Sequence, residues 1–239
     1  MSFYYAPELT EKNRFITLPV AEGIHLKRVI RKKVGEKITL TNGKGLNCEA
    51  LIEKMNSNQL ICRVLSVKTK SSPSEANIHI ALSVIRPNRT DWAVEKLTEL
   101  GVGTISFFYS EHSNIRAFKS DHLQKVAISA IKQSEQLFLP HIHAPIEFQN
   151  LIEQVSKKPE RIKLIAHNGN ESKKLFDIKI KRKVPFFIAI GPEGGFSNSE
   201  ISYAKSKGFQ LLKIDRYILR TETAAISAAI QLKNLILAK

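Results

Sequence analysis

The sequence predicts a two-part α/β protein, with a small β-barrel followed by a larger domain in which helices cover a mostly parallel sheet. Residues up to about 70 form a series of short strand-like runs separated by turns. From residue 77 onward, apolar β-branched runs alternate with helical patterns, which implies a parallel sheet covered on both faces. The polar stretch Lys68 to Glu75 contains a proline and predicts a boundary between residues 1–72 and 73–239.

The first part is expected to be all β. Its strands are predicted over residues 14–18, 37–41, 46–52 and 59–67. The turn Asn42-Gly43-Lys44-Gly45 between the second and third strands is typical of a hairpin, because Asn and Gly tolerate positive φ. Several short strands around one small core predict the barrel.

The second part alternates strands with helices. Strands are expected over residues 78–85, 104–109, 162–167 and 184–190. Helices are expected over residues 90–100, 121–138, 148–155 and 223–237, and a further helix should follow Ser197. Gly101 ends the first of these helices, and Ser120 caps the second.

The chain is strongly basic. Its 37 Lys and Arg against 22 Asp and Glu give a formal charge of +15, which favours an anionic partner without choosing between RNA, DNA and acidic lipid. Residues 1–70 hold thirteen Lys and Arg against six Glu, so the first third is the better candidate for holding phosphate. A basic cluster there is often only a solvated surface, but on this chain we favour nucleic-acid contact. The cluster comprises Lys27, Arg28, Arg31, Lys32 and Lys33.

The cysteines and the hydropathy pattern favour a cytoplasmic protein with no membrane partner. Cys48 and Cys62 lie in strand-like runs and are expected to be small buried hydrophobes in a reducing compartment. No apolar run reaches a membrane-spanning length, and the N-terminus lacks the charged and apolar regions of a signal peptide.

The loop Gly191-Pro192-Glu193-Gly194-Gly195 lies where a buried strand is followed by a helix. The run Ser197 to Glu200 has the spacing of a capping box. Such a junction directs unpaired backbone amides and the positive end of a helix dipole toward a crevice. The loop lacks the Lys-Ser or Lys-Thr pair of a Walker loop and the GxGxxG spacing of a dinucleotide fold. It predicts a ligand site, with a tight turn between buried elements as the alternative.

A second loop has more polar residues than a helix cap requires. Arg220, Thr221, Glu222 and Thr223 separate the apolar run 217–219 from an alanine-rich helix. Capping explains one threonine, and the helix dipole explains Glu222, but neither explains Arg220. The surplus favours a site shared with the Gly191 loop. The alanines would also allow close packing against another surface, such as a second subunit.

No metal site is expected. His141 and His143 form an HxH pattern, but Pro140 and Pro145 flank it and no carboxylate or cysteine cluster accompanies it. The spacing of the chain indicates neither a Ser-His-Asp nor a Cys-His arrangement.

The two late loops, GPEGGFSNSE and ILRTETAA, resemble the C-terminal motifs of the RsmE family, which methylates uridine N3 in small-subunit ribosomal RNA with S-adenosylmethionine. The resemblance covers the whole chain. Arg14-Phe15, the run 25–31 and the Asn42 turn resemble the family's N-terminal barrel, and residues 95–102 resemble its "QKATELGV" helix. Residues 111–113 and 132–134 fall where the family has "ERS" and "QS".

The resemblance implies a PUA-like RNA-binding β-barrel over residues 1–72 and a SPOUT methyltransferase domain over residues 73–239. In that domain the C-terminal part threads a trefoil knot, and the active site forms in a homodimer. The expected substrate is 16S rRNA or the small ribosomal subunit, methylated at the decoding-region uridine 1498. Alternatives are a SPOUT methyltransferase with another RNA target and a non-catalytic RNA-binding relative.

The resemblance also implies the site residues. S-adenosylmethionine would be held mainly by main-chain groups, without a metal, at three loops. The expected donor-binding residues are His167, Asn168, Gly169, Gly191, Pro192, Glu193, Gly194, Gly195, Ile214, Ile218, Leu219, Arg220, Thr221, Thr223 and Ala224. The expected RNA contacts are Arg14, Lys27, Arg28, Arg31, Lys32, Arg86 and Arg89.

Methylation at N3 requires a weakly acidic imide to lose its proton. Arg220 is predicted to stabilise the uracil anion, and either Glu222 or Glu193 to accept the proton. The chain departs from the family pattern at Asp215, where glycine is usual, and at His112 and Gln136, where arginine is usual.

Overall fold

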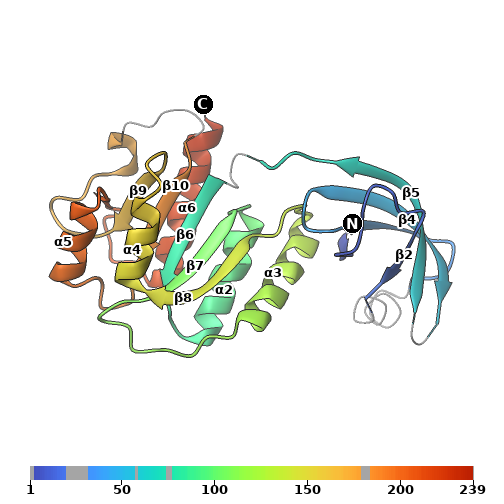
Figure 1. The fold of residues 1–239 in the computed structure, drawn as a ribbon, viewed down its shortest axis with the longest axis horizontal. Coiled ribbons are helices and arrows are strands. Elements are labelled where there is room, and N and C mark those ends of the chain that lie inside the picture. The colour runs from blue at the N-terminus through green and yellow to red at the C-terminus, as the bar shows by residue number, and fades with distance from the viewer. Residues whose placement is uncertain (1–2, 20–31, 57–58, 74–76, 179–183, 239) are drawn as a thin grey trace. The chain divides into compact units, whose positions relative to one another are not determined.

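The computed structural model describes residues 3–19, 32–56, 59–73, 77–178 and 184–238. Contacts group the chain into two compact units (Figure 1). One contains Met1–Ser72 together with Ile128–Leu139, and the other contains Pro73–Ala127 and Pro140–Lys239. Residues 128–139 thus belong to the first unit, although they lie beyond the predicted boundary at residue 72.

The first unit is a curled five-stranded sheet in the order β1-β3-β4-β5-β2. All neighbours pair antiparallel except β1 with β3. Apolar side chains alternate along β4 and meet those of the other strands in one core. The predicted strands are confirmed, and β1 was not predicted. The bounds are β1 (Phe3–Tyr5), β2 (Phe15–Leu18), β3 (Lys37–Thr41), β4 (Leu46–Met55) and β5 (Leu60–Thr69).

The predicted hairpin turn joins β3 to β4. The Asn42 side-chain oxygen accepts the backbone N–H groups of Lys44 at 2.8 Å and Leu46 at 3.2 Å. Gly45 has φ +101, and a Cβ there would lie 2.6 Å from the Lys70 carbonyl oxygen, so this position requires glycine. The Gly45 N–H donates to the carbonyl of Leu137, which fixes residues 137–139 against the turn.

Both cysteines lie in the core of this unit as free thiols, as expected. Burial raises the pKa of Cys48 to about 11 and that of Cys62 to about 12. Neither thiol is therefore ionised near neutral pH.

The second unit is built on a six-stranded sheet in the order β11-β9-β10-β6-β7-β8, and every neighbouring pair is parallel. The predicted fold class, an α/β domain with a mostly parallel sheet behind an N-terminal β domain, is confirmed. The bounds are β6 (Ile78–Ser83), β7 (Thr104–Tyr109), β8 (His141–Glu147), β9 (Ile162–Ala166), β10 (Phe186–Ile190) and β11 (Gln210–Leu212).

Helices cover both faces of this sheet. On one face, α4 and α5 bury aromatic and aliphatic side chains against β6, β7, β9 and β10. On the other, α2 and α6 contact each other, and α6 packs on β6 and β10 (Figure 1). The bounds are α2 (Pro87–Glu99), α3 (Ser120–Ser134), α4 (Phe148–Ser156), α5 (Asn198–Ser206) and α6 (Thr221–Leu237), with a short 3-10 helix η3 (Leu175–Asp177).

Several element bounds differ from the prediction. The strands β8 and β11 were not predicted, because β8 carries Pro145 and β11 has only three residues. A proline is tolerated in β8, which lies at the edge of the sheet. The helix α3 ends at Ser134 rather than at residue 138, because Glu135 adopts φ 56. The last helix begins at Thr221 rather than Thr223.

A neutral histidine lies at the start of β6. The His79 Nδ1 atom is 3.1 Å from an Arg161 guanidinium nitrogen, which can only donate, so Nε2 carries the proton and donates to the Ser106 hydroxyl at 2.7 Å. Burial, followed by the charge of Arg161, lowers the pKa of His79 to about 3.

Among the described residues, no helix is both long and apolar enough to cross a membrane.

Candidate functional site

The site lies at the carboxyl edge of the parallel sheet, where the direction of the strand order reverses. Along the chain, β10 is added on one side of β9, whereas β11 is added on the other. Loops that leave neighbouring strands on opposite sides of such a point separate and leave a crevice. The loops after β9, β10 and β11 line a cavity of about 300 Å³ there, which we call the edge cavity. Its size falls within the ~300 to 1,000 Å³ typical of small-molecule sites.

Most of the residues expected to bind the donor line the edge cavity. These are His167, Asn168, Gly191, Pro192, Glu193, Gly194, Gly195, Ile214, Ile218, Leu219, Thr221 and Ala224. Gly169, Arg220 and Thr223 are not among its lining residues. Six lining residues were not predicted: Ala166, Ile190, Phe196, Leu212, Asp215 and Tyr217.

The loop of residues 191–195 is shaped by glycine and by its own hydrogen bonds. The Gly195 N–H donates to the Pro192 carbonyl at 2.9 Å, and Gly195 adopts φ +69. At Gly191, a Cβ would lie 3.0 Å from the Phe196 ring. Both positions therefore favour glycine, and they leave main chain without side chains on the wall of the edge cavity.

Side chains from other elements hold the same loop in place. The Thr221 hydroxyl, buried at the start of α6, donates to the Gly191 carbonyl at 2.8 Å. The His112 Nδ1 atom lies 3.1 Å from the Gly194 carbonyl oxygen and 3.2 Å from that of Gly195, so it carries a proton and donates. The histidine that replaces the family's usual arginine therefore contacts the loop backbone directly.

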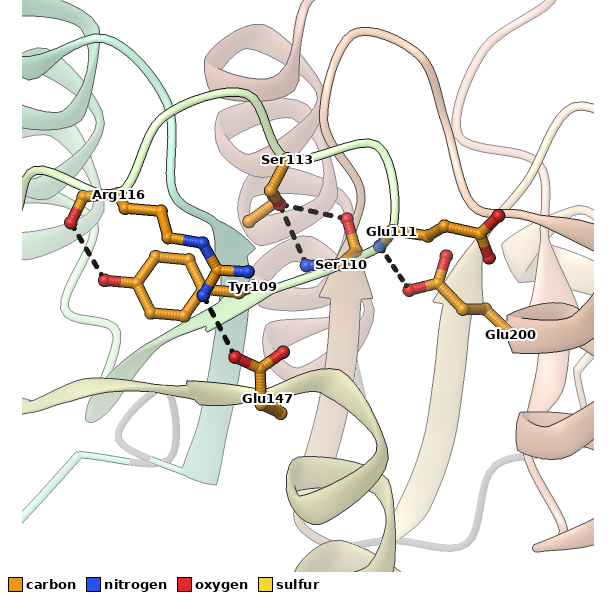
Figure 2. Close-up of polar contacts among 8 residues, drawn as sticks. Tyr109, Ser110, Glu111, Ser113, Arg116, Glu147 and Glu200 are labelled. Carbon is orange, nitrogen blue, oxygen red and sulfur yellow. Dashed lines mark hydrogen bonds and ion pairs between the residues drawn. The ribbon is translucent and has the colours of Figure 1, made fainter.

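A buried carboxylate joins the loop after β7 to the loop after β10. Glu200, in the first turn of α5, accepts the Ser197 N–H at 2.9 Å, while the Ser197 hydroxyl accepts the Glu200 N–H at 3.3 Å. The predicted capping box is thus confirmed. The other Glu200 oxygen accepts the Glu111 N–H at 3.0 Å (Figure 2). One carboxylate therefore orders both loops.

The loop after β7 is also fixed at its two ends. At one end, the Ser113 hydroxyl accepts the Ser110 N–H at 2.8 Å (Figure 2). At the other, the Tyr109 hydroxyl donates to the Arg116 carbonyl at 3.0 Å, and the Arg116 guanidinium lies 4.6 Å above the Tyr109 ring. Arg116 also donates to Glu147 at 3.1 Å. This arrangement keeps His112 beside the loop of residues 191–195.

The wall formed by residues 214–219 has a turn of its own. An Asp215 carboxylate oxygen accepts the Tyr217 N–H at 2.9 Å, and Gln231 of α6 donates to the Ile214 carbonyl at 3.0 Å. The Asn168 amide donates to the Tyr217 carbonyl at 3.4 Å. Asp215, where the family usually has glycine, thus stabilises this wall by an Asx-type turn.

The three candidate catalytic residues lie in different environments. Glu193 lines the edge cavity with its side chain 53% exposed, whereas the Glu222 side chain is 6% exposed and does not line it. Arg220 is exposed and precedes α6. The Arg89 guanidinium lies 2.6 Å from Glu193 and 3.6 Å from Glu222. Sequence reasoning missed this link between α2, α6 and the loop, because it joins residues about a hundred positions apart.

The expected RNA contacts that the structure describes come from both units. Arg14 and Arg86 are exposed, and Lys32 forms an ion pair with Glu36 at 3.2 Å. The guanidinium of Arg89 is directed to the two carboxylates. The remaining expected contacts, Lys27, Arg28 and Arg31, lie outside the described residues. Within the described ranges, no group of three His, Cys, Asp or Glu residues could hold a metal ion.

Comparisons with known proteins give the same assignment along the whole chain. A family model described as an RNA methyltransferase domain matches residues 72–233, and one described as an RNA methyltransferase PUA domain matches residues 18–65. The ribosomal RNA small subunit methyltransferase E of Rickettsia conorii is 30% identical over 237 residues, covering 97% of this chain and 94% of the relative. The protein of that name from Aquifex aeolicus is 28% identical and covers 98% of this chain and 100% of the relative.

Solved structures share the fold of the whole chain. The ribosomal RNA small subunit methyltransferase E from Neisseria gonorrhoeae, bound to S-adenosyl methionine, has a TM-score of 0.90 and 31% identity over 98% of both chains. A probable rRNA-methyltransferase from Porphyromonas gingivalis has a TM-score of 0.89 and 32% identity, covering 100% of this chain and 99% of the other.

Proposed function

Because this chain belongs to the RsmE family of RNA methyltransferases, as its motifs predicted, we propose that it methylates small-subunit ribosomal RNA with S-adenosylmethionine. The proposed target is N3 of the decoding-region uridine. The proposal rests on the edge cavity, whose walls include the two motifs that resemble those of the family. The solved Neisseria gonorrhoeae relative with S-adenosyl methionine bound supports the choice of donor.

The edge cavity suits S-adenosylmethionine. Its walls combine apolar side chains, such as Ile214, Ile218 and Leu219, with glycine backbone, which fits a purine ring and a polar tail held by main-chain groups. We assign donor binding to the predicted residues that line the cavity. When bound, the donor supplies a methyl group already activated on a sulfonium, so no covalent enzyme intermediate is required.

Three residues around the cavity have separate proposed roles in the methyl transfer. Arg220 is exposed immediately after Leu219, which lines the cavity, so its guanidinium is available to stabilise the negative charge that develops on the uracil oxygens. Of the two candidate bases, Glu193 lines the cavity, and we assign proton acceptance from N3 to it. Glu222 is buried beside Arg89, and we assign it the role of holding that arginine.

The same proposal implies roles for the two parts of the chain, a homodimer and a cellular location. Residues 1–72 would serve as the PUA-like RNA-binding domain, and residues 73–239 as the SPOUT methyltransferase domain. A homodimer is proposed, for which α6 offers the exposed side chains Ile230 and Leu237. The alanines of α6, expected to allow packing against a second subunit, are buried within the chain itself. We also propose a cytoplasmic location, where ribosomal subunits are found.

Nucleoside analysis tests the proposal. Small subunits that lack the modification are incubated with the protein and labelled S-adenosylmethionine, and their RNA is digested and analysed by mass spectrometry. Labelled 3-methyluridine is the expected product. A different labelled nucleoside would move the assignment to another target, and no transfer to subunits or to free 16S rRNA would contradict methyltransferase activity.

A further inference from the structure

A second cavity adjoins the edge cavity and has a different chemical character. It encloses about 680 Å³, and we call it the basic groove. The two cavities share Ile214, Asp215 and Tyr217, so the segment of residues 214–217 separates them. The groove is lined by Lys174, Leu175, Phe176, Lys213, Ile214, Asp215, Arg216, Tyr217 and Gln231.

Hydrogen bonds fix both walls of the groove. The Lys173 N–H donates to the Leu211 carbonyl at 3.0 Å, and the Lys213 N–H donates to the Lys173 carbonyl at 2.8 Å, so the segments on either side are joined. In η3, the Asp177 carboxylate accepts the Lys174 N–H at 3.1 Å. The Gln231 side-chain amide donates a hydrogen bond to the Ile214 carbonyl at 3.0 Å. The groove is therefore a built feature of the fold.

Two aromatic rings are exposed at this groove. As whole residues, Phe176 is 83% exposed and Tyr217 is 62% exposed. The Arg216 guanidinium lies over the Tyr217 ring, 4.6 Å from its centre, and so occupies one face of that ring. Phe176 thus offers a ring face to a ligand. Exposed apolar surface gathered at a cavity marks binding sites more often than scattered single residues do.

The charge of the groove favours an anion. Three cationic side chains, Lys174, Lys213 and Arg216, line it together with one carboxylate, Asp215. That carboxylate already accepts a backbone N–H, and the nearby Asp177 carboxylate accepts another. Aromatic faces beside cationic side chains are the combination with which proteins hold single-stranded nucleic acid.

We propose that the basic groove binds one nucleotide of single-stranded RNA, with its base stacked on Phe176 and its phosphate facing Lys174, Lys213 and Arg216. This inference rests on the proposed function, because it places an RNA nucleotide beside the donor cavity. A second copy of the chain fits less well. A two-fold interface centred on the groove would bring its three cations against the same three cations of the partner.

The test separates base stacking from phosphate contact. Binding of a fluorescent uridine octamer, and of an abasic octamer with the same phosphates, is measured by anisotropy. Phe176→Ala should weaken binding of the uridine octamer by about 5- to 150-fold and leave the abasic octamer unchanged. Phe176→Trp should restore binding. Lys213→Gln should weaken the binding of both oligomers. It should also reduce the slope of log affinity against log salt concentration by about 0.7.

A matched charge control distinguishes the groove from the general basicity of the chain. Lys157→Gln removes the same charge at the exposed end of α4 and should change neither affinity. Equal loss in Lys157→Gln and Lys213→Gln, or unchanged uridine binding in Phe176→Ala, would overturn the proposal. So would conversion of a dimer to a monomer by Phe176→Ala, because the groove would then be a subunit interface.

The outcome for the groove is distinguishable from the outcome for the proposed function. Methyl transfer and S-adenosylmethionine affinity are measured for wild type and Phe176→Ala. Undiminished transfer by the variant at low RNA concentration would refute the groove and leave the function standing. Absence of transfer by wild type would refute the function, while the octamer measurements would still decide whether the groove binds RNA.

Discussion

Replacing Thr221 by valine should weaken donor binding without unfolding the protein. The Thr221 side chain is buried, with the residue 3% exposed, and its only hydrogen bond described here is the 2.8 Å contact with the Gly191 carbonyl. Valine keeps the shape and removes the donor. Losing one partner of a buried hydrogen bond costs about 1 to 3 kcal/mol. If that free energy stabilises the binding conformation of the loop, S-adenosylmethionine affinity falls by about 5- to 150-fold.

Titration calorimetry measures the affinity, and a thermal melt of the same samples measures stability. Thr223→Val is the matched control, because this threonine lies on the same helical turn but is exposed and does not line the edge cavity. Its affinity should equal that of wild type. A Thr221→Val protein with wild-type donor affinity and a lowered melting temperature would contradict this prediction, because the hydrogen bond would then support the fold alone.

Further predictions concern catalysis, pH and thiol reactivity. Arg220→Ala should keep donor affinity and lose about 10²- to 10³-fold in single-turnover transfer; a wild-type rate would remove Arg220 from the mechanism. Because the folded-state pKa of His79, about 3, lies below the usual 6.5, the unfolded chain takes the proton first as pH falls. Urea unfolding should therefore show wild type losing about 1 kcal/mol more than His79→Gln between pH 6.5 and 5.5; parallel losses would contradict this. Cys48 and Cys62 should resist alkylation until the chain unfolds, and rapid labelling of native protein would show that these thiols are accessible.

Local patterns predicted the long strands and helices but not the short or edge elements. The strand β7 matched its predicted bounds, because six consecutive residues carry the pattern of a buried strand. The strand β11 has three residues and no pattern of its own, and its place follows from pairing with β9. The strand β8 was obscured by its histidines and Pro145, which an edge position tolerates.

The candidate site was predictable where its residues are contiguous. The glycine loop and the polar run 220–223 each stand out in a short window of sequence. The side chains that hold them do not, because His112 reaches Gly194 across 82 positions and Arg89 reaches Glu193 across 104. No helical or strand period relates such pairs, so only the folded sheet brings them together. The basic groove was likewise hidden, since Phe176 and Arg216 belong to separate segments.

A crystal structure of this chain with S-adenosylmethionine would test the assignment of the edge cavity most directly. We propose that residues 191–195 and 214–221 are two walls of one donor cavity. We expect ligand density in the edge cavity, with hydrogen bonds to main-chain groups of both walls. Density at any other location, with the edge cavity occupied only by solvent, would contradict it.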